Sequence, residues 1–170
     1  MKLMVASDIH GSALYCQKML DAFEKEQADM LLLLGDILYH GPRNDLPDGY
    51  APKEVIRLLN PLKSKILCIR GNCDTEVDQM VLEFPILSES CLLWLDGQRL
   101  FAVHGHKSGP ETLPLCPGDL LFSGHTHVPH DKVVNGVRCL NPGSVSIPKE
   151  GSARSYIVWE NGEAAFHPLA

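Results

Sequence analysis

Near its N-terminus the chain reads KLMVASDIHG (residues 2–11), an apolar run that ends in an acid and a histidine. The run predicts a buried strand over residues 2–6. Residues 12–27 follow, and their apolar side chains at roughly helical spacing predict an amphipathic helix packed through Leu14, Met19, Leu20 and Phe23. A second apolar run over residues 29–34 ends at Asp36. This order predicts a β-α-β unit with parallel strands.

The rest of the chain divides into a helical and a hairpin-rich half. A loop over residues 39–52 leads into a predicted helix over 52–59, which begins at a proline, and a predicted strand over 65–69. In the second half a strand is expected over 119–122, and three pairs of strand-like runs flank Asp96-Gly97, Asn135-Gly136 and Asn161-Gly162. Such dipeptides favour two-residue hairpin turns. We therefore expect two packed sheets with helices outside.

Composition narrows the class of protein. The 170 residues are 45% hydrophobic and 21% charged, which is typical of a globular chain, and we expect a single domain over residues 1–170. The net charge of −6, without a cluster of Lys and Arg, argues against a nucleic-acid platform. No apolar run reaches the roughly 20 residues of a membrane span, and no signal peptide pattern follows Met1. The six scattered cysteines then fit reduced thiols, and we expect a cytoplasmic protein.

Seven potential metal ligands stand at the ends of five strand-like runs: Asp8, His10, Asp36, Asn72, His104, His125 and His127. Ligands two residues apart in an extended segment point to the same side, so each Asp-x-His or His-x-His pair can reach one ion. Oxygen and nitrogen donors without thiolate favour Mn²⁺, Fe²⁺, Zn²⁺ or Mg²⁺. Seven donors exceed one tetrahedral ion and fit two ions that share a carboxylate. A glycine in each fragment allows close backbone approach at the turn.

Each fragment also has a simpler interpretation when it stands alone. Gly-Asp after a strand is commonly a turn, and His104 and His106 could be surface histidines. Gly124-His125-Thr126-His127 is the most specific of the five. It is the combination of all five, each after an apolar run, that predicts one metal site assembled at the ends of strands.

The order of these fragments, from Val5 to Ser146, resembles the calcineurin-like metallophosphoesterase superfamily. The short length, Gly71-Asn72-Cys73-Asp74 and Asn141-Pro142-Gly143-Ser144 make the chain similar to the bacterial phosphodiesterases of the YfcE type. The resemblance implies a fold of the α/β or α+β class, a four-layer αββα sandwich of two mixed β-sheets flanked by helices. It also implies a divalent-metal-dependent phosphodiesterase that acts on a small phosphodiester.

The same resemblance implies roles for individual residues. Asp8, His10, Asp36 and His127 would hold a first ion, and Asp36, Asn72, His104 and His125 a second, with Asp36 bridging. A hydroxide between the ions would attack phosphorus, and Asn72 would help to stabilise the phosphoryl oxygens. Mn²⁺ is the expected metal, with Zn²⁺, Fe²⁺, Mg²⁺ and Ni²⁺ as alternatives. We count Asp36, Asn72, His104 and His106 as candidate catalytic residues.

One position departs from the family pattern. Many relatives have a histidine after the motif asparagine, often assigned as the proton donor to the leaving group, and here Cys73 stands there. A thiol of ordinary pKa near 8.5 is a weak substitute, which favours esters with good leaving groups or another donor such as His106. Asp74 could orient a ligand histidine or cap a helix from Thr75 onward, Arg70 could contact phosphate or form an ion pair, and Ser144 could bond near the site.

Three functions remain open from the sequence. A phosphodiesterase is the leading hypothesis, and a phosphomonoesterase of the same fold is weakened only by Cys73. A non-catalytic interaction scaffold is the third, because a eukaryotic retromer subunit resembles the same family and serves mainly in protein binding. That scaffold departs from the family ligand set, whereas every ligand position is filled here. The hairpins near the C-terminus could offer an edge for a homo-oligomer.

Overall fold

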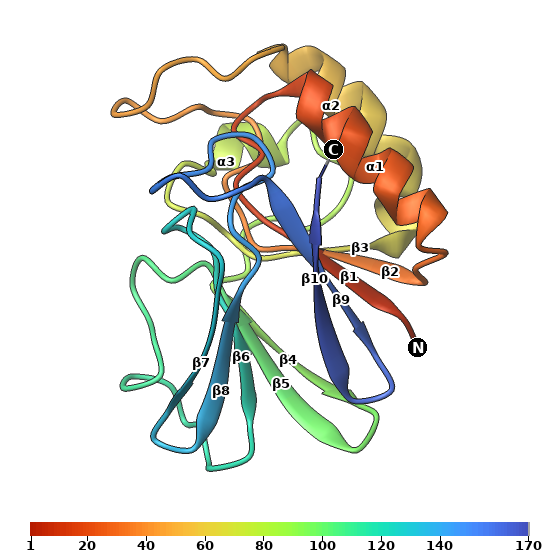
Figure 1. Ribbon diagram of the computed structural model, residues 1–170. Coiled ribbons are helices and arrows are strands. Elements are labelled where there is room, and N and C mark those ends of the chain that lie inside the picture. The colour runs from red at the N-terminus through yellow and green to blue at the C-terminus, as the bar shows by residue number, and fades with distance from the viewer. Residues whose placement is uncertain (170) are drawn as a thin grey trace.

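The computed structural model describes residues 1–169, in which two β-sheets pack against each other with helices outside (Figure 1). The strands of the first sheet are β1 (Leu3–Ala6), β2 (Met30–Leu33), β3 (Ile66–Cys68), β9 (Ser155–Glu160) and β10 (Glu163–Pro168). Those of the second are β4 (Ser90–Leu95), β5 (Gln98–Val103), β6 (Leu120–Phe122), β7 (His130–Val134) and β8 (Val137–Asn141). The helices are α1 (Ala13–Lys25), α2 (Pro52–Leu59), α3 (Glu76–Gln79) and the 3₁₀ helix η1 (Asn60–Lys65).

The first sheet has the order β10-β9-β1-β2-β3. Strands β1, β2 and β3 are parallel, as predicted for the β-α-β unit, while β9 and β10 are antiparallel additions. Every residue of β1 is buried, because helices cover one face of this sheet and the second sheet covers the other. A strand buried on both faces is a continuous apolar run rather than an alternating one.

Helix α1 packs on the outer face of the first sheet. It begins after Ser12, whose side chain accepts a hydrogen bond from the Tyr15 amide at 3.2 Å and so caps the first turn. Met19, Leu20 and Phe23 face the core as predicted, together with Tyr15 and Cys16. The prediction was wrong for Leu14, which is 44% exposed. The buried stripe starts one residue later, because the Ser12 cap sets where the first turn faces.

The second sheet has the order β4-β5-β6-β8-β7, with β5, β6 and β8 parallel and β4 and β7 antiparallel at the edges. All three predicted hairpins form, and two of them lie in this sheet. In each, the Asp-Gly or Asn-Gly pair has positive φ at both residues, 52° and 76° at Asp96-Gly97 for example. That conformation matches the twist of the flanking strands.

The core consists of three apolar clusters. One lies between the first sheet and its helices, a second fills the space between the sheets around Phe122 and Trp159, and a third lies on the outer face of the second sheet. The predicted fold of two mixed sheets flanked by helices is confirmed. On the outer face of the second sheet, however, the segment over residues 105–119 covers the third cluster as an irregular loop, with Leu113 and Leu115 as the packing residues.

No helix within residues 1–169 combines the length and the apolar character that crossing a bilayer would require.

Candidate metal centre

The five sequence fragments meet at one end of the two sheets. Each follows a parallel strand: β1, β2 and β3 in the first sheet, β5 and β6 in the second. The carboxyl ends of parallel strands in one sheet point to the same edge, which is where ligands bind in open sheets of this kind. The predicted site at strand ends is therefore built from two sheets rather than one.

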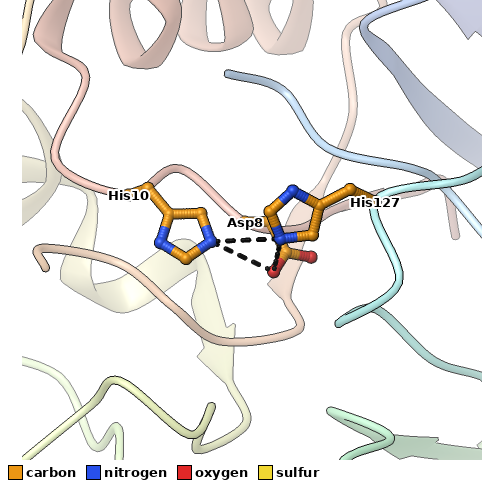
Figure 2. Close-up of side chains that lie close together, drawn as sticks. All are labelled: Asp8, His10 and His127. Atoms are coloured by element: carbon orange, nitrogen blue, oxygen red, sulfur yellow. Dashed lines mark hydrogen bonds and ion pairs between the residues drawn. The ribbon is translucent and has the colours of Figure 1, made fainter. Parts of the chain in front are cut away.

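Asp8, His10 and His127 form the first group of candidate ligands (Figure 2). The Nε2 atom of His127 lies 3.2 Å from Asp8 Oδ1, and that of His10 lies 3.5 Å from the same oxygen. The two Nε2 atoms are 3.2 Å apart. All three residues are buried, and their side chains converge from the segments that follow β1 and β6.

Asp36, His104 and Asn72 form the second group. Asp36 Oδ2 lies 3.4 Å from His104 Nε2, and Asn72 Oδ1 lies 3.1 Å from that same nitrogen. Asp36 Oδ2 is also 3.6 Å from His10 Nε2, which belongs to the first group. The Asp36 carboxylate thus stands between the two groups, where a shared ligand has to be.

Backbone carbonyls fix the orientation of three of the imidazoles. The Nδ1 atoms of His10, His104 and His127 lie 2.8, 2.6 and 2.6 Å from carbonyl oxygens of Tyr39, Leu34 and Ile147. A carbonyl can only accept, so each Nδ1 carries the proton and donates it. In the neutral ring Nε2 then presents its lone pair to the cluster, the arrangement found in metal-binding histidines.

The contacts within the first group fit a bound cation. Neutral His10 and His127, with Nδ1 donating, bring two lone pairs to 3.2 Å of one another, which is repulsive unless a proton or a metal lies between. Asp8 Oδ1 is buried and has no hydrogen-bond donor among the described residues. A buried carboxylate oxygen without a partner is costly, and a divalent cation would satisfy it together with both rings.

The charges of the site are strongly coupled even without an ion. Burial alone would raise the pKa of Asp8, but the adjacent imidazoles of His10 and His127 outweigh it and hold that pKa well below its usual range. Burial likewise disfavours the charged form of His104, yet its hydrogen bond to Asp36 and the nearby carboxylates raise the pKa to about 9. The cluster therefore binds positive charge, as a proton or as a metal.

The candidate ligands themselves carry much of the backbone strain. Five of the seven have positive φ, between 48° and 66°: Asp8, His10, Asp36, His125 and His127. Residues with a side chain rarely adopt this region, and such strain concentrates at functional sites. The sequence predicts close backbone approach at the neighbouring glycines, but nothing in it predicts positive φ at the ligands themselves.

Two of those glycines are required for a different reason, namely close approach. A Cβ atom at Gly71 would lie 2.1 Å from Asp36 Oδ1, and one at Gly124 would lie 2.0 Å from Ser7 Oγ. The Ser7 hydroxyl in turn donates to Asp8 Oδ2 at 2.6 Å. Both glycines thus leave room for the carboxylates of the site.

Asp74 supports the site through the backbone. Its carboxylate accepts hydrogen bonds from the amides of Asp36, Ile37 and Gly71 at 2.8, 2.9 and 2.7 Å. Burial raises its pKa to about 6 despite these donors. Neither predicted role of Asp74 is correct, because it contacts no ligand histidine and the helix cap is Thr75.

The Asn141-Pro142-Gly143-Ser144 loop also holds the site. The hydroxyls of Ser144 and Ser146 both donate to the Asp8 carbonyl, at 2.8 and 2.9 Å. Ser144 therefore bonds near the site, as predicted. Arg70, by contrast, forms an ion pair with Glu76 at 3.2 Å.

Three further candidates lie at the edge of the cluster. The His125 ring is centred 5.1 Å from that of His104, and the His106 ring is 5.4 Å from His104 and 6.1 Å from His125. His106 does not line the cavity over the ligands, and its role as proton donor stays a prediction. Cys73 does line that cavity, and its Sγ can approach His10 and Asp36. Burial and the nearby carboxylates raise the pKa of the Cys73 thiol to about 12, so it stays neutral.

The cavity over the ligands has a volume of about 430 Å³. Its walls include His10, Asp36, Asn72, His125 and His127, and Arg43 and Lys149 stand among its lining residues. The site therefore combines a cluster suited to cations with an opening that can admit a small anionic molecule.

Comparison with known proteins agrees with this geometry. A model of the calcineurin-like phosphoesterase superfamily domain matches residues 1–163. Phosphodiesterase YfcE of Escherichia coli K12 is 51% identical over 162 residues, which cover 95% of this chain and 88% of that protein. A solved structure of YfcE, described as a phosphoesterase from E. coli, aligns with a TM-score of 0.92 and 46% identity over 100% of both chains.

More distant similarity extends to the fold alone. A structure of a Vps29 variant from Entamoeba histolytica aligns with a TM-score of 0.65 at 22% identity, covering 98% of this chain and 97% of that one. The architecture is therefore shared more widely than the close sequence similarity.

Proposed function

The chain belongs to the calcineurin-like phosphoesterase superfamily, and we propose that it is a phosphodiesterase whose seven candidate ligands hold two divalent cations. Asp8, His10, Asp36 and His127 would hold one, and Asp36, Asn72, His104 and His125 the other. The observation that carries this proposal is the position of Asp36, whose Oδ2 is within 3.6 Å of a histidine nitrogen in each group. A similar protein, 51% identical, is named a phosphodiesterase.

Bound divalent cations supply Lewis-acid polarisation of phosphoryl oxygens and lower the pKa of water. The protein supplies the positions. Hydrogen bonds to carbonyls hold His10, His104 and His127 with Nε2 inward, and the Asp74 carboxylate holds the backbone at Asp36. Asn72 presents an amide beside the same cavity, where it can donate a hydrogen bond to a phosphoryl oxygen.

Mn²⁺ is the metal we propose, because the donor set mixes carboxylates, imidazoles and an amide oxygen. The substrate we propose is a small phosphodiester, which a cavity of about 430 Å³ can admit. The neutral thiol of Cys73 makes a weak proton donor, so diesters with good leaving groups should be the better substrates. The filled ligand set argues against a purely scaffolding role.

The experiment is hydrolysis of bis-p-nitrophenyl phosphate by purified protein, metal-free and after addition of Mn²⁺, Zn²⁺ or Mg²⁺. We expect metal-dependent cleavage that Asp36→Ala reduces by more than 100-fold. Asp131→Asn is the matched control, since its carboxylate pairs with Arg138 on the surface and should leave the rate unchanged. A fully active, folded Asp36→Ala protein would refute the proposal, and faster cleavage of monoesters would favour the phosphomonoesterase alternative.

A further inference from the structure

A second cavity adjoins the one over the metal ligands. It has a volume of about 450 Å³ and shares Arg43 and Asn44 with the first cavity. Its remaining walls come from the loop between β2 and α2 and from the segment between β8 and β9, which includes Ser146 and Arg154. These are the orange and blue loops at the upper left of Figure 1. A molecule bound at the metal ligands can therefore extend past Arg43 into the second cavity.

Arg154 is held in place on the wall of this second cavity. Its guanidinium carbon lies 4.0 Å from the centre of the Tyr15 ring, and its Nε donates to the Ser146 carbonyl at 3.2 Å. Stacking uses the face of the guanidinium and leaves the N–H groups at its outer edge available. A planar fork that is already oriented loses little freedom when it binds a phosphate through two parallel hydrogen bonds.

The cations of this region are free of acidic partners. Among residues 1–169, no carboxylate forms an ion pair with Arg43, Lys149 or Arg154. Two acids, Asp45 and Asp48, also line the second cavity; both are exposed on the loop, as Arg43 is, so water weakens but does not remove their repulsion of a bound anion. In a chain of net charge −6, two arginines without acidic partners at one cavity concentrate positive charge locally.

We propose that the second cavity is an anion subsite, and that the substrate is a phosphodiester carrying a further phosphoryl group on one arm. The scissile phosphoryl group would lie at the metal ligands, and the second would bind Arg154 and Arg43. This inference rests on the proposed phosphodiesterase function and narrows its substrate class. Nucleotide-like diesters with a terminal phosphate have this chemistry.

Two substrates that differ in one group test the subsite. The p-nitrophenyl ester of thymidine 5′-monophosphate lacks the extra phosphate, and the 5′-p-nitrophenyl ester of thymidine 3′,5′-bisphosphate carries it. Both release p-nitrophenolate, so the chemical step is the same. We expect the bisphosphate derivative to show a KM about tenfold lower at a similar kcat, the size expected for hydrogen bonds between charged groups.

Substitutions that remove a positive or a negative charge from the second cavity test the subsite further. Arg154→Gln should abolish the KM difference, and Arg43→Gln should reduce it, whereas Asp45→Asn should lower the KM of the bisphosphate substrate further. Arg57→Gln, an exposed arginine on α2 paired with Glu54, is the matched control and should behave as the wild type. A thermal melt of each variant identifies any that fail to fold.

Equal KM values for the two substrates in the wild type would overturn the subsite and leave the phosphodiesterase function intact. Failure to cleave either substrate with any metal would instead refute the function. The subsite would then be decided by calorimetry on the same protein. We expect thymidine 3′,5′-bisphosphate to bind about tenfold more tightly than thymidine 5′-monophosphate, and Arg154→Gln to remove this difference. Any other result would refute the subsite.

Discussion

The Nε2 atoms of His10 and His127 face each other at 3.2 Å, while the Nδ1 atom of each ring donates to a backbone carbonyl. Two neutral rings held in this way repel unless a cation lies between them. The two histidines are 117 residues apart in the chain, so the tertiary fold alone brings them into contact. Stability of this region and binding of a metal ion are therefore linked.

The first prediction follows from that linkage. Adding Mn²⁺ to metal-free protein should raise the thermal midpoint, by the equivalent of about 2.7 kcal/mol for each site at a free concentration 100 times its dissociation constant. His127→Ala should remove the share of this increase that comes from the first ion, because Asp8 and His10 then lose a shared ligand. Differential scanning calorimetry measures it. His167→Ala, at a half-buried histidine outside the site, should keep the full increase, and a full increase in His127→Ala would contradict the proposed ligand set.

The second prediction concerns pH. Burial lowers the pKa of His104, but Asp36 outweighs it and raises this pKa to about 9. The metal-free protein therefore holds a proton on the His104 ring. That proton stabilises the metal-free fold fully below about pH 6.5, and the stabilisation is lost as pH rises through 9. A metal requires the neutral ring, so its binding should release protons and grow tighter from pH 6 to 9. Titration calorimetry in buffers of different ionisation enthalpy detects the released protons, and none at pH 7 would count against this account.

Much of the architecture was predictable because its determinants are local. Asn-Gly and Asp-Gly pairs fix the three hairpins, and the apolar runs before Asp8 and Asp36 mark strands whose ends carry ligands. The features that escaped prediction depend on distant contacts. Asp74 accepts from the Asp36 amide across 38 residues, and the left-handed φ of Asp36 is maintained by such packing. Neither leaves a local pattern in the sequence.

The third prediction tests that contact. Asp74→Asn keeps the shape of the side chain but directs an amide NH₂ toward backbone donors that need an acceptor. We expect a loss of about 1–3 kcal/mol in the free energy of unfolding, because buried amides of Ile37 or Gly71 lose their partner. The rate should also fall at saturating Mn²⁺, since Asp36 shifts. Urea unfolding and kcat measure the two effects, and Asp78→Asn, at the exposed cap of α3, should show little effect on kcat.

The fourth prediction concerns Cys73. Its thiol is neutral and lines the cavity, so Cys73→Ala should change hydrolysis of bis-p-nitrophenyl phosphate by no more than about threefold. Cys73→His places a stronger acid at the same wall and should accelerate diphenyl phosphate, which has a poorer leaving group, by about tenfold or more. The ratio of kcat/KM for the two diesters is the measurement. Loss of all activity in Cys73→Ala would instead make the thiol a required ligand.

The fifth prediction lies outside the site, at the base of the second sheet. Asp119 is buried and accepts hydrogen bonds from Arg99 Nε at 2.9 Å and from the Cys116 amide at 2.7 Å. Both bonds lower the pKa of Asp119, and the bond from Arg99 has the larger effect. A depressed carboxyl pKa stabilises the fold above about pH 4, and this stabilisation disappears as pH falls through the folded value. Asp119→Asn should therefore lower the urea midpoint clearly at pH 7 and by less below pH 3. Asp131→Asn, at the more exposed pair with Arg138, should have a smaller effect at pH 7. An equal loss for Asp119→Asn at both pH values would show that the charge of Asp119 contributes nothing.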